Sequence, residues 1–324
     1  MSFREVLGFR YWVLGSLISF NVFAQQDALV SQYMHLPVLF NPASVGAEDK
    51  IKAGLLFRRQ WVGMNNAPST NGFVVDMPFN YSRMGLGVNV LQESIVAENK
   101  LTFQLCYSYK INLAKGKMAF GMNAGAINYR FDDSKIAIKD ADDKVIGNGA
   151  LASTQPDFGF GFYYHSAKWQ LGISANHLLK HKLGYFDELV ANATVTRQVY
   201  GFAKRNFKLN EKYTVSTSVL AKIQQPVNVS QAEANAILVF KDELWLGAGY
   251  RTLKAATFQI GFKMGKVNQS LQDIRLSYNY DLALENPTSS FGPTHEIVLR
   301  AFFDKPLKPE RIQNKPKAIS PLDL

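Results

Sequence analysis

Large apolar residues alternate with small or polar residues along most of the chain after residue 50. Within 101–112, apolar side chains occupy every second position from Leu101 to Ile111, and mainly polar side chains fill the positions between them. The segments 169–176 and 274–282 repeat this arrangement. A period of two is that of a β-strand whose two faces meet different environments. The pattern therefore predicts an all-β protein.

The alternation predicts about fourteen antiparallel strands in a single domain, 51–303. The strands are expected near 51–60, 71–79, 84–92, 100–111, 117–129, 156–165, 167–177, 194–206, 213–224, 229–240, 243–252, 256–264, 271–282 and 294–303. The strand near 194–206 has an ambiguous phase, so the sequence does not assign its two faces.

The composition of the two strand faces distinguishes a membrane barrel from a soluble one. The apolar face carries large aliphatic and aromatic residues for about nine to eleven positions, which is the length of a tilted strand that crosses a bilayer. The other face is mostly Gly, Ser, Asn, Gln and Thr, and only 19% of all residues are charged. We therefore expect a transmembrane outer-membrane β-barrel, closed because lipid offers no partner to the amide groups of an open edge. A soluble carbohydrate-binding β protein is the alternative, and it would need a densely charged exterior.

Connection lengths indicate which end of the barrel faces outward, because outer-membrane barrels have short periplasmic turns and longer external loops. If the first strand rises outward, the longer connections lie outside, at 61–70, 93–99, 130–155, 178–193 and 283–293. The connections expected at the opposite end, such as 80–83 and the hairpin at Lys241 and Asp242, are short. An even number of strands also returns the C-terminus to the periplasm.

The segments outside the barrel have signatures of their own. Residues 1–24 combine basic residues with a short apolar run and small residues at its end, the pattern of a secretory signal peptide. Residues 25–50 have no strand period and contain Pro37 and Pro42, so they are predicted to form a periplasmic cap or a plug. The tail, 304–324, is rich in proline and lysine and is interpreted as a basic periplasmic arm.

Charged residues on the polar strand faces are expected to point into the lumen. The principal candidates are Arg58, Asp76, Arg251, Arg275, Asp281, Glu296 and Arg300, with Lys52, Lys110, Lys222, Lys263 and Glu233 beside them. Two arrangements remain open. The charges pair across the lumen and hold it shut, or the lumen conducts and favours anions because cations are in excess.

The sequence has no recognisable catalytic, cofactor-binding or metal-binding motif, so an enzymatic function is not expected. The single cysteine, Cys106, excludes a disulfide framework and a cysteine-based metal cluster. The five histidines lie in no nucleophile motif. The net charge of +10 is spread along the chain, which gives little support to a nucleic-acid partner. Acidic residues within 130–155 leave calcium binding by that loop open.

Six short strings follow one another in a specific order and spacing. They are Gln32-Tyr33-Met34, Asn41-Pro42-Ala43-x-x-Gly46, Arg59-Gln60-Trp61-Val62-Gly63, Ala67-Pro68-Ser69-Thr70, Tyr278-x-Tyr280-Asp281-Leu282 and His295-Glu296-Ile297. Together they resemble the PorP/SprF membrane proteins of the type IX secretion system of Bacteroidetes, and the likeness runs over most of the chain after residue 24.

The resemblance implies a non-enzymatic barrel of the cell outer membrane, without a cofactor, that assists export of large proteins and, in gliding bacteria, surface retention of adhesins. Its expected partners are outer-membrane lipid, the C-terminal signal domain of a secreted adhesin, and a periplasmic secretion or peptidoglycan-binding lipoprotein. External loops would contact the adhesin, and the segments 25–50 and 304–324 would contact the periplasmic machinery. Candidate partner-binding residues are Gln32, Tyr33, Asn41, Pro42, Gly46, Arg59, Trp61 and Pro68. The alternative function is an outer-membrane channel or a transporter for hydrophobic solutes.

Overall fold

The structure, a computed structural model, covers the predicted barrel domain with a few gaps. It describes residues 30–48, 50–79, 83–132, 151–179, 196–225, 229–252, 254–265, 270–285 and 288–303. The predicted signal peptide, the predicted tail and most of 130–155 and 178–193 lie outside the described residues. Within the parts that are described, no helix is long and apolar enough to cross a membrane.

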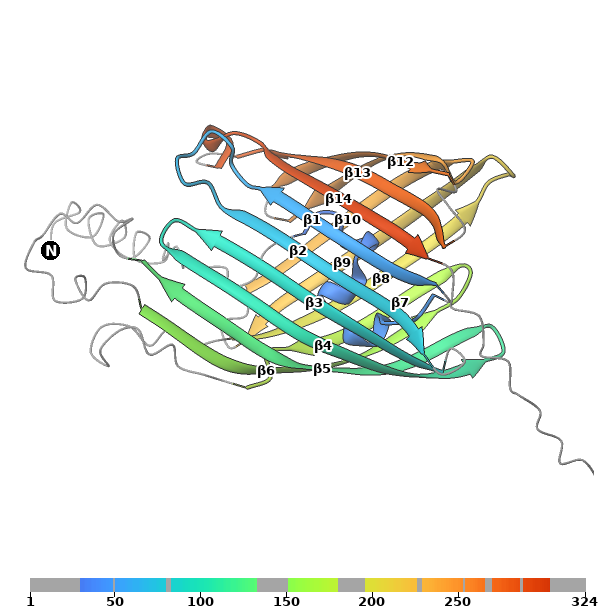
Figure 1. Cartoon of the computed structure of the whole chain (residues 1–324). Coiled ribbons are helices and arrows are strands. Elements are labelled where there is room, and N and C mark those ends of the chain that lie inside the picture. Colours follow the sequence, from blue (N-terminus) through green and yellow to red (C-terminus); the bar gives the residue numbers. More distant parts are fainter. Residues whose placement is uncertain are drawn as a thin grey trace, which may run out of the picture.

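Fourteen strands form one closed barrel, in which each strand pairs antiparallel with its neighbours and β1 pairs with β14 (Figure 1). The strands are β1 (Ile51–Arg59), β2 (Ser69–Phe79), β3 (Met84–Ile95), β4 (Glu98–Leu113), β5 (Gly116–Phe131), β6 (Leu151–His165), β7 (Trp169–Asn176), β8 (Arg197–Lys208), β9 (Tyr213–Gln225), β10 (Val229–Phe240), β11 (Leu244–Arg251), β12 (Ala255–Met264), β13 (Leu271–Ala283) and β14 (Thr294–Phe303). The predicted closed, fourteen-stranded antiparallel barrel is confirmed.

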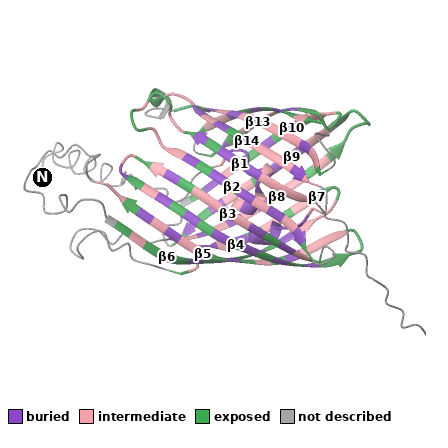
Figure 2. Ribbon diagram, viewed as in Figure 1, coloured by how far each residue is buried: buried purple, intermediate pink, exposed green. Residues whose placement is uncertain are grey.

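The barrel is apolar outside and polar inside. On β4, Leu101 is 45% exposed and Leu105 is 55% exposed, whereas the side chains at the alternate positions, such as Gln104 at 4%, are buried. Buried and exposed positions alternate along most strands (Figure 2). This is the reverse of a soluble barrel, and it is the arrangement that hydrocarbon around the cylinder requires.

The structure of β8 explains why the sequence did not assign its two faces. Its inward-facing residues include Tyr200 and Phe202, both buried, while its outward face carries Phe207. The inward aromatic rings pack against the contents of the lumen, with ring centroids 5.9 Å apart for Tyr200 and Phe40 and 6.0 Å apart for Phe202 and Tyr33. Both strand faces are therefore apolar in this region.

The two ends of the barrel differ in their connections. Ile51 and Phe303 pair at one end, which we call the inner end, and it also holds the turns 114–115, 166–168 and 241–243. The opposite, outer end holds the long connections. The segment 93–99 was wrongly predicted to be one of them, because β3 and β4 continue to a tight turn at Val96 and Ala97.

Residues 30–48 lie inside the barrel and form a plug (Figure 1). Three short 3-10 turns make up most of it, namely η1 (Tyr33–His35), η2 (Pro37–Leu39) and η3 (Pro42–Ser44). Proline at the start of η2 and of η3 fixes a turn conformation and prevents one continuous helix. The plug supplies Tyr33, Met34, Phe40, Ala43 and Ala47 to the largest cluster of buried apolar side chains. Another 3-10 turn, η5 (Thr288–Phe291), lies in the connection before β14.

Candidate functional site

The plug is anchored towards the outer end by a buried cluster of charges around Ser31. The Ser31 hydroxyl donates a hydrogen bond of 2.8 Å to Asp281 and accepts hydrogen bonds from Arg58, at 2.9 Å, and Arg251, at 2.6 Å. The backbone amides of Ser31 and Gln32 donate to the two carboxylate oxygens of Glu296, at 2.9 and 2.8 Å. One serine thus links the plug to β1, β11, β13 and β14.

The charges of this cluster also pair with each other. Arg58 lies 2.9 Å from Asp281 and 2.9 Å from Glu296, and Arg251 lies 2.6 Å from Glu233 and 3.3 Å from Asp281. All five side chains are buried. Buried ions of this kind are stable only when each has both a counter-charge and further hydrogen bonds. The plug amides and hydroxyl supply part of that second requirement.

The middle of the plug binds β6 and β7 through main-chain groups. The Phe40 carbonyl accepts hydrogen bonds from Ser174, at 2.6 Å, and from Asn176, at 3.0 Å. Asn41 donates to the Phe162 carbonyl at 3.0 Å, and its side-chain oxygen accepts from the Ala43 amide. On the neighbouring strand β5, Gly121 makes room for the plug, since a Cβ atom there would lie 2.4 Å from the Ala43 Cα.

Tyr33 joins the plug to β9 and β10. Its hydroxyl donates to the Glu233 carbonyl at 3.1 Å and lies 3.2 Å from the Ser218 hydroxyl. Burial raises the pKa of Tyr33 to about 12, so the hydroxyl keeps the proton that it donates.

The inner end of the plug is held by Gly46, whose φ of 65° suits glycine. Its amide donates to Asp76, and its carbonyl accepts from the Lys110 ammonium group. Asp76 in turn lies 2.8 Å from Lys52. The preceding carbonyl, of Val45, accepts from the Ser108 hydroxyl at 2.6 Å.

The structure divides the predicted partner-binding residues into two groups. Gln32, Tyr33, Asn41, Pro42 and Gly46 are buried in the lumen and contact the barrel's own wall. The other group is at the outer rim and consists of Arg59, Trp61 and Pro68. The described plug residues therefore fill the lumen and do not form a cap below the barrel.

At the outer rim, the first and last external connections pack together. The Trp61 ring lies 5.9 Å from that of Phe291, and the Gly63 amide donates to the Phe291 carbonyl at 2.9 Å. The Val62 amide donates to the Pro293 carbonyl at 3.0 Å. Trp61 thus braces one loop against another.

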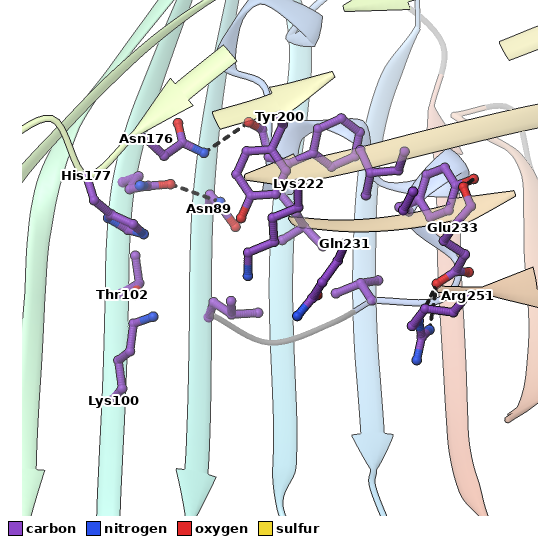
Figure 3. Close-up of a pocket in the computed structure, with 18 residues that line it drawn as sticks. Asn89, Lys100, Thr102, Asn176, His177, Tyr200, Lys222, Gln231, Glu233 and Arg251 are labelled. Atoms are coloured by element: carbon purple, nitrogen blue, oxygen red, sulfur yellow. Dashed lines mark hydrogen bonds and ion pairs between the residues drawn. The ribbon is translucent and has the colours of Figure 1, made fainter. Parts of the chain in front are cut away.

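A cavity of about 80 Å³ lies between the plug and the outer mouth (Figure 3). Plug residues such as Tyr33 and Phe40 form its floor, and its polar residues come from several strands. Its cations have partners. Lys100 lies 3.0 Å from Glu93, His177 lies 2.9 Å from Asp157, and Lys222 lies 6.0 Å from the Tyr200 ring centroid.

A larger cavity, of about 340 Å³, lies between the plug and the inner end, and we call it the inner cavity. It is lined by Met34, His35 and Pro37 from the plug and by Glu48, Lys50 and Lys52 before and within β1. The rest of its lining comes from β7 to β14 and the turn after β10, and includes Lys204, Asp242, Trp245, Arg275, Arg300 and Phe302. Of the predicted lumen charges, Arg275 and Arg300 lie here, whereas Arg58, Arg251, Asp281 and Glu296 form the cluster around Ser31.

Sequence reasoning missed several residues that hold the plug. Ser31 lies in the plug, Ser108 and Ser174 lie on polar strand faces, and the partners of all three hydroxyl groups are distant in the chain. Lys204 was missed because the phase of its strand was ambiguous. The one signal that could have assigned the faces of β8 is the run of small or β-branched residues at Val199, Gly201 and Ala203, which face outward and alternate with the inward positions.

Comparison with solved structures finds other barrels. The "CymD monoaromatic hydrocarbon channel" aligns at 12% identity over 87% of this chain and 94% of that chain, with a TM-score of 0.47. A Pseudomonas aeruginosa FadL homologue aligns at 12% over 82% and 92%, with a TM-score of 0.47, and the Pseudomonas putida toluene transporter TodX at 11% over 83% and 94%, with a TM-score of 0.46.

Comparison with curated proteins finds no match. The family described as "Type IX secretion system membrane protein PorP/SprF" matches residues 22–301, which include β1 to β13 and all but the last two residues of β14. The chain therefore belongs to the PorP/SprF family of type IX secretion system membrane proteins and is an outer-membrane barrel.

Proposed function

We propose that this chain is a closed, non-enzymatic docking component of the outer membrane, which assists export or surface anchoring of large proteins such as adhesins through their C-terminal signal domain. On the periplasmic side it contacts a secretion or peptidoglycan-binding lipoprotein. The observation that carries the proposal is a lumen filled by the plug in a member of a secretion family. A folded domain has no path through such a lumen, so it serves secretion by binding at the barrel ends.

The outer rim supplies two features suited to a protein partner. The paired connections around Trp61 and Phe291 form an ordered surface beside the mouth. In addition, the ladder between β6 and β7 begins at Phe160, so outward of the hydrogen bond from the Leu178 amide to the Phe158 carbonyl the described part of β6 has one paired neighbour, β5. Unpaired main-chain groups on a strand can accept an added strand from another chain. Both features support docking of an exported domain outside.

A deletion strain tests the proposal. Without this protein, we expect adhesins with the relevant C-terminal domain to be retained inside the cell or shed into the medium, and the wild-type gene to restore their display. Antibody labelling of intact cells and of the culture supernatant measures both outcomes, with an unrelated outer-membrane protein as the control. Normal display of every surface adhesin in the deletion strain would contradict the proposal.

The second candidate is a channel or transporter for hydrophobic solutes. The observation that favours it is the cavity between the plug and the outer mouth. Leu39, Leu91 and Leu220 contribute to its lining. Its volume of about 80 Å³ is small, however, since ligand pockets are usually about 300 Å³ or larger. A steady conductance in planar bilayers would support this candidate. A silent barrel that copurifies with a large adhesin would support docking.

A further inference from the structure

The inner cavity has more positive than negative charges along its wall. The cations that line it are Lys50, Lys52, Lys204, Arg275 and Arg300, and the anions are Glu48 and Asp242. The cavity borders the turn at Asp242 and the residues just before β1, so it faces the inner, periplasmic end of the barrel.

The two anions already have cationic partners. Glu48 lies 3.7 Å from Lys52, and Asp242 lies 3.1 Å from Lys263 and 3.5 Å from Arg275. Two of the cations are also bound to carboxylates outside the cavity lining. Lys52 lies 2.8 Å from Asp76, and Arg275 lies 3.0 Å from Asp273.

Lys50, Lys204 and Arg300 are left over, and of these Lys204 and Arg300 lie on strands of the barrel wall. Neither lies within 4.0 Å of a carboxylate among the described residues, and the buried Nε atom of Arg300 has no hydrogen-bond partner there. The two side chains come from β8 and β14 and line the same cavity, where Lys204 is subject to the negative charge of Glu48 as well as to the positive charge of Arg300. Two cations in one enclosed space repel each other, and that repulsion is relieved by an anion between them.

The strand register places a second guanidinium group beside Arg300. Arg275 and Arg300 lie directly opposite each other on β13 and β14. Like charges at such a position destabilise a sheet. Both guanidinium groups lie over the Phe302 ring, with the central carbon 4.8 Å from the ring centroid for Arg275 and 5.7 Å for Arg300. Planar, oriented guanidinium groups suit the oxygens of carboxylate and phosphate.

We propose that the inner cavity binds an anionic group, a carboxylate or a phosphate, which enters from the periplasmic end and lies between Lys204 and Arg300. A volume of about 340 Å³ admits a small anion or one or two acidic side chains. The inference concerns the purified chain and does not depend on the proposed role in secretion. The anionic group comes either from a free anion or from an acidic segment of a periplasmic protein, and the probes below distinguish the two.

Titration of the full-length protein in a nonionic detergent tests the site. The probes are inorganic phosphate and a hexaglutamate peptide, each measured by calorimetry at low and at high salt. The variants are Lys204→Gln and Arg300→Gln, and the matched control is Lys212→Gln, an exposed lysine in the turn after β8. Circular dichroism confirms that each variant retains the barrel, so a loss of binding is not a loss of fold.

We expect at least one probe to bind, with a dissociation constant that rises at least tenfold in both cavity variants and stays unchanged in Lys212→Gln. Binding of phosphate identifies a free anion as sufficient, whereas binding of hexaglutamate alone identifies an acidic segment. The proposal is overturned if neither probe binds, or if both cavity variants bind as tightly as the wild type.

Discussion

Ser31 donates a hydrogen bond of 2.8 Å to Asp281, although 250 positions separate the two residues in the chain. The contact joins the start of the described plug to the second-last strand. Ser31 also bonds to Arg58 on β1 and Glu296 on β14, and these are the two strands that close the barrel. Because the anchor is assembled from both ends of the barrel sequence, it is complete only when the barrel has closed. Plug docking and barrel closure are therefore coupled.

Replacing the serine at this anchor tests how much the plug contributes to stability. The Ser31→Ala change removes three side-chain hydrogen bonds to charged groups, and each such bond contributes about 1.5–3 kcal/mol. We expect a loss of at least about 2 kcal/mol in the free energy of unfolding, measured by urea titration in lipid vesicles. Ser230→Ala, on the exposed face of β10, is the control and should stay near the wild type.

The buried charges of the same cluster should be far more sensitive than exposed ones. Arg58→Ala leaves Asp281 and Glu296 with less compensation in a buried site, which typically costs about 3–5 kcal/mol. Lys254→Ala breaks a pair with Glu285 whose side chains are 53% and 56% exposed, and we expect less than about 1 kcal/mol. Equal losses of unfolding free energy for the two variants would argue against a buried charge cluster.

Displacement of the plug can be followed with the single native cysteine. Cys106 is 2% exposed and belongs to a buried apolar cluster with Val38 and Val45 of the plug. A Gly121→Val change places side-chain atoms where the Ala43 backbone now lies, so the plug must shift. We expect the rate of maleimide labelling of Cys106 to rise at least tenfold.

Gly201→Val is the matched control for this experiment, because a Cβ atom at Gly201 meets nothing within 4 Å. Its labelling rate should equal that of the wild type. If Gly121→Val labels no faster while circular dichroism shows an intact barrel, then the plug does not protect Cys106.

His35 should make the folded protein less stable as the pH falls below neutrality. Burial, together with the positive charges of Arg300, Lys204 and Arg275, lowers the pKa of His35 well below its usual value. Near pH 5 the unfolded chain therefore binds a proton that the folded chain does not, and stability rises with pH across this range. We expect His35→Gln to reduce the difference in unfolding free energy between pH 7 and pH 5. An unchanged difference would show that His35 is not the group responsible.

Alternation made the strands predictable, and its failures were local. The segment from Leu101 to Ile111 was enough to predict β4 as a membrane strand, because only a wall between lipid and a polar interior keeps one strand face apolar for that length. The turn at Val96 and Ala97 was missed because neither residue is a typical turn residue, although Val96 adopts a φ of 52°. The inward aromatic rings of β8 obscured its phase because they pack on the plug, which the strand's own sequence does not reveal.

The sequence by itself determined the closed barrel, its number of strands and the charges on its polar faces, because these depend on local period and on the solvent that surrounds each face. Only the tertiary structure decided what fills the lumen and which charges are satisfied. Arg251 and Arg300 look alike along the chain, yet Arg251 is paired with Glu233 and bound to Ser31, while Arg300 lines the inner cavity with no carboxylate of the described residues within 4.0 Å. That difference depends on distances between residues far apart in sequence, which are set when the plug and the closed barrel pack together.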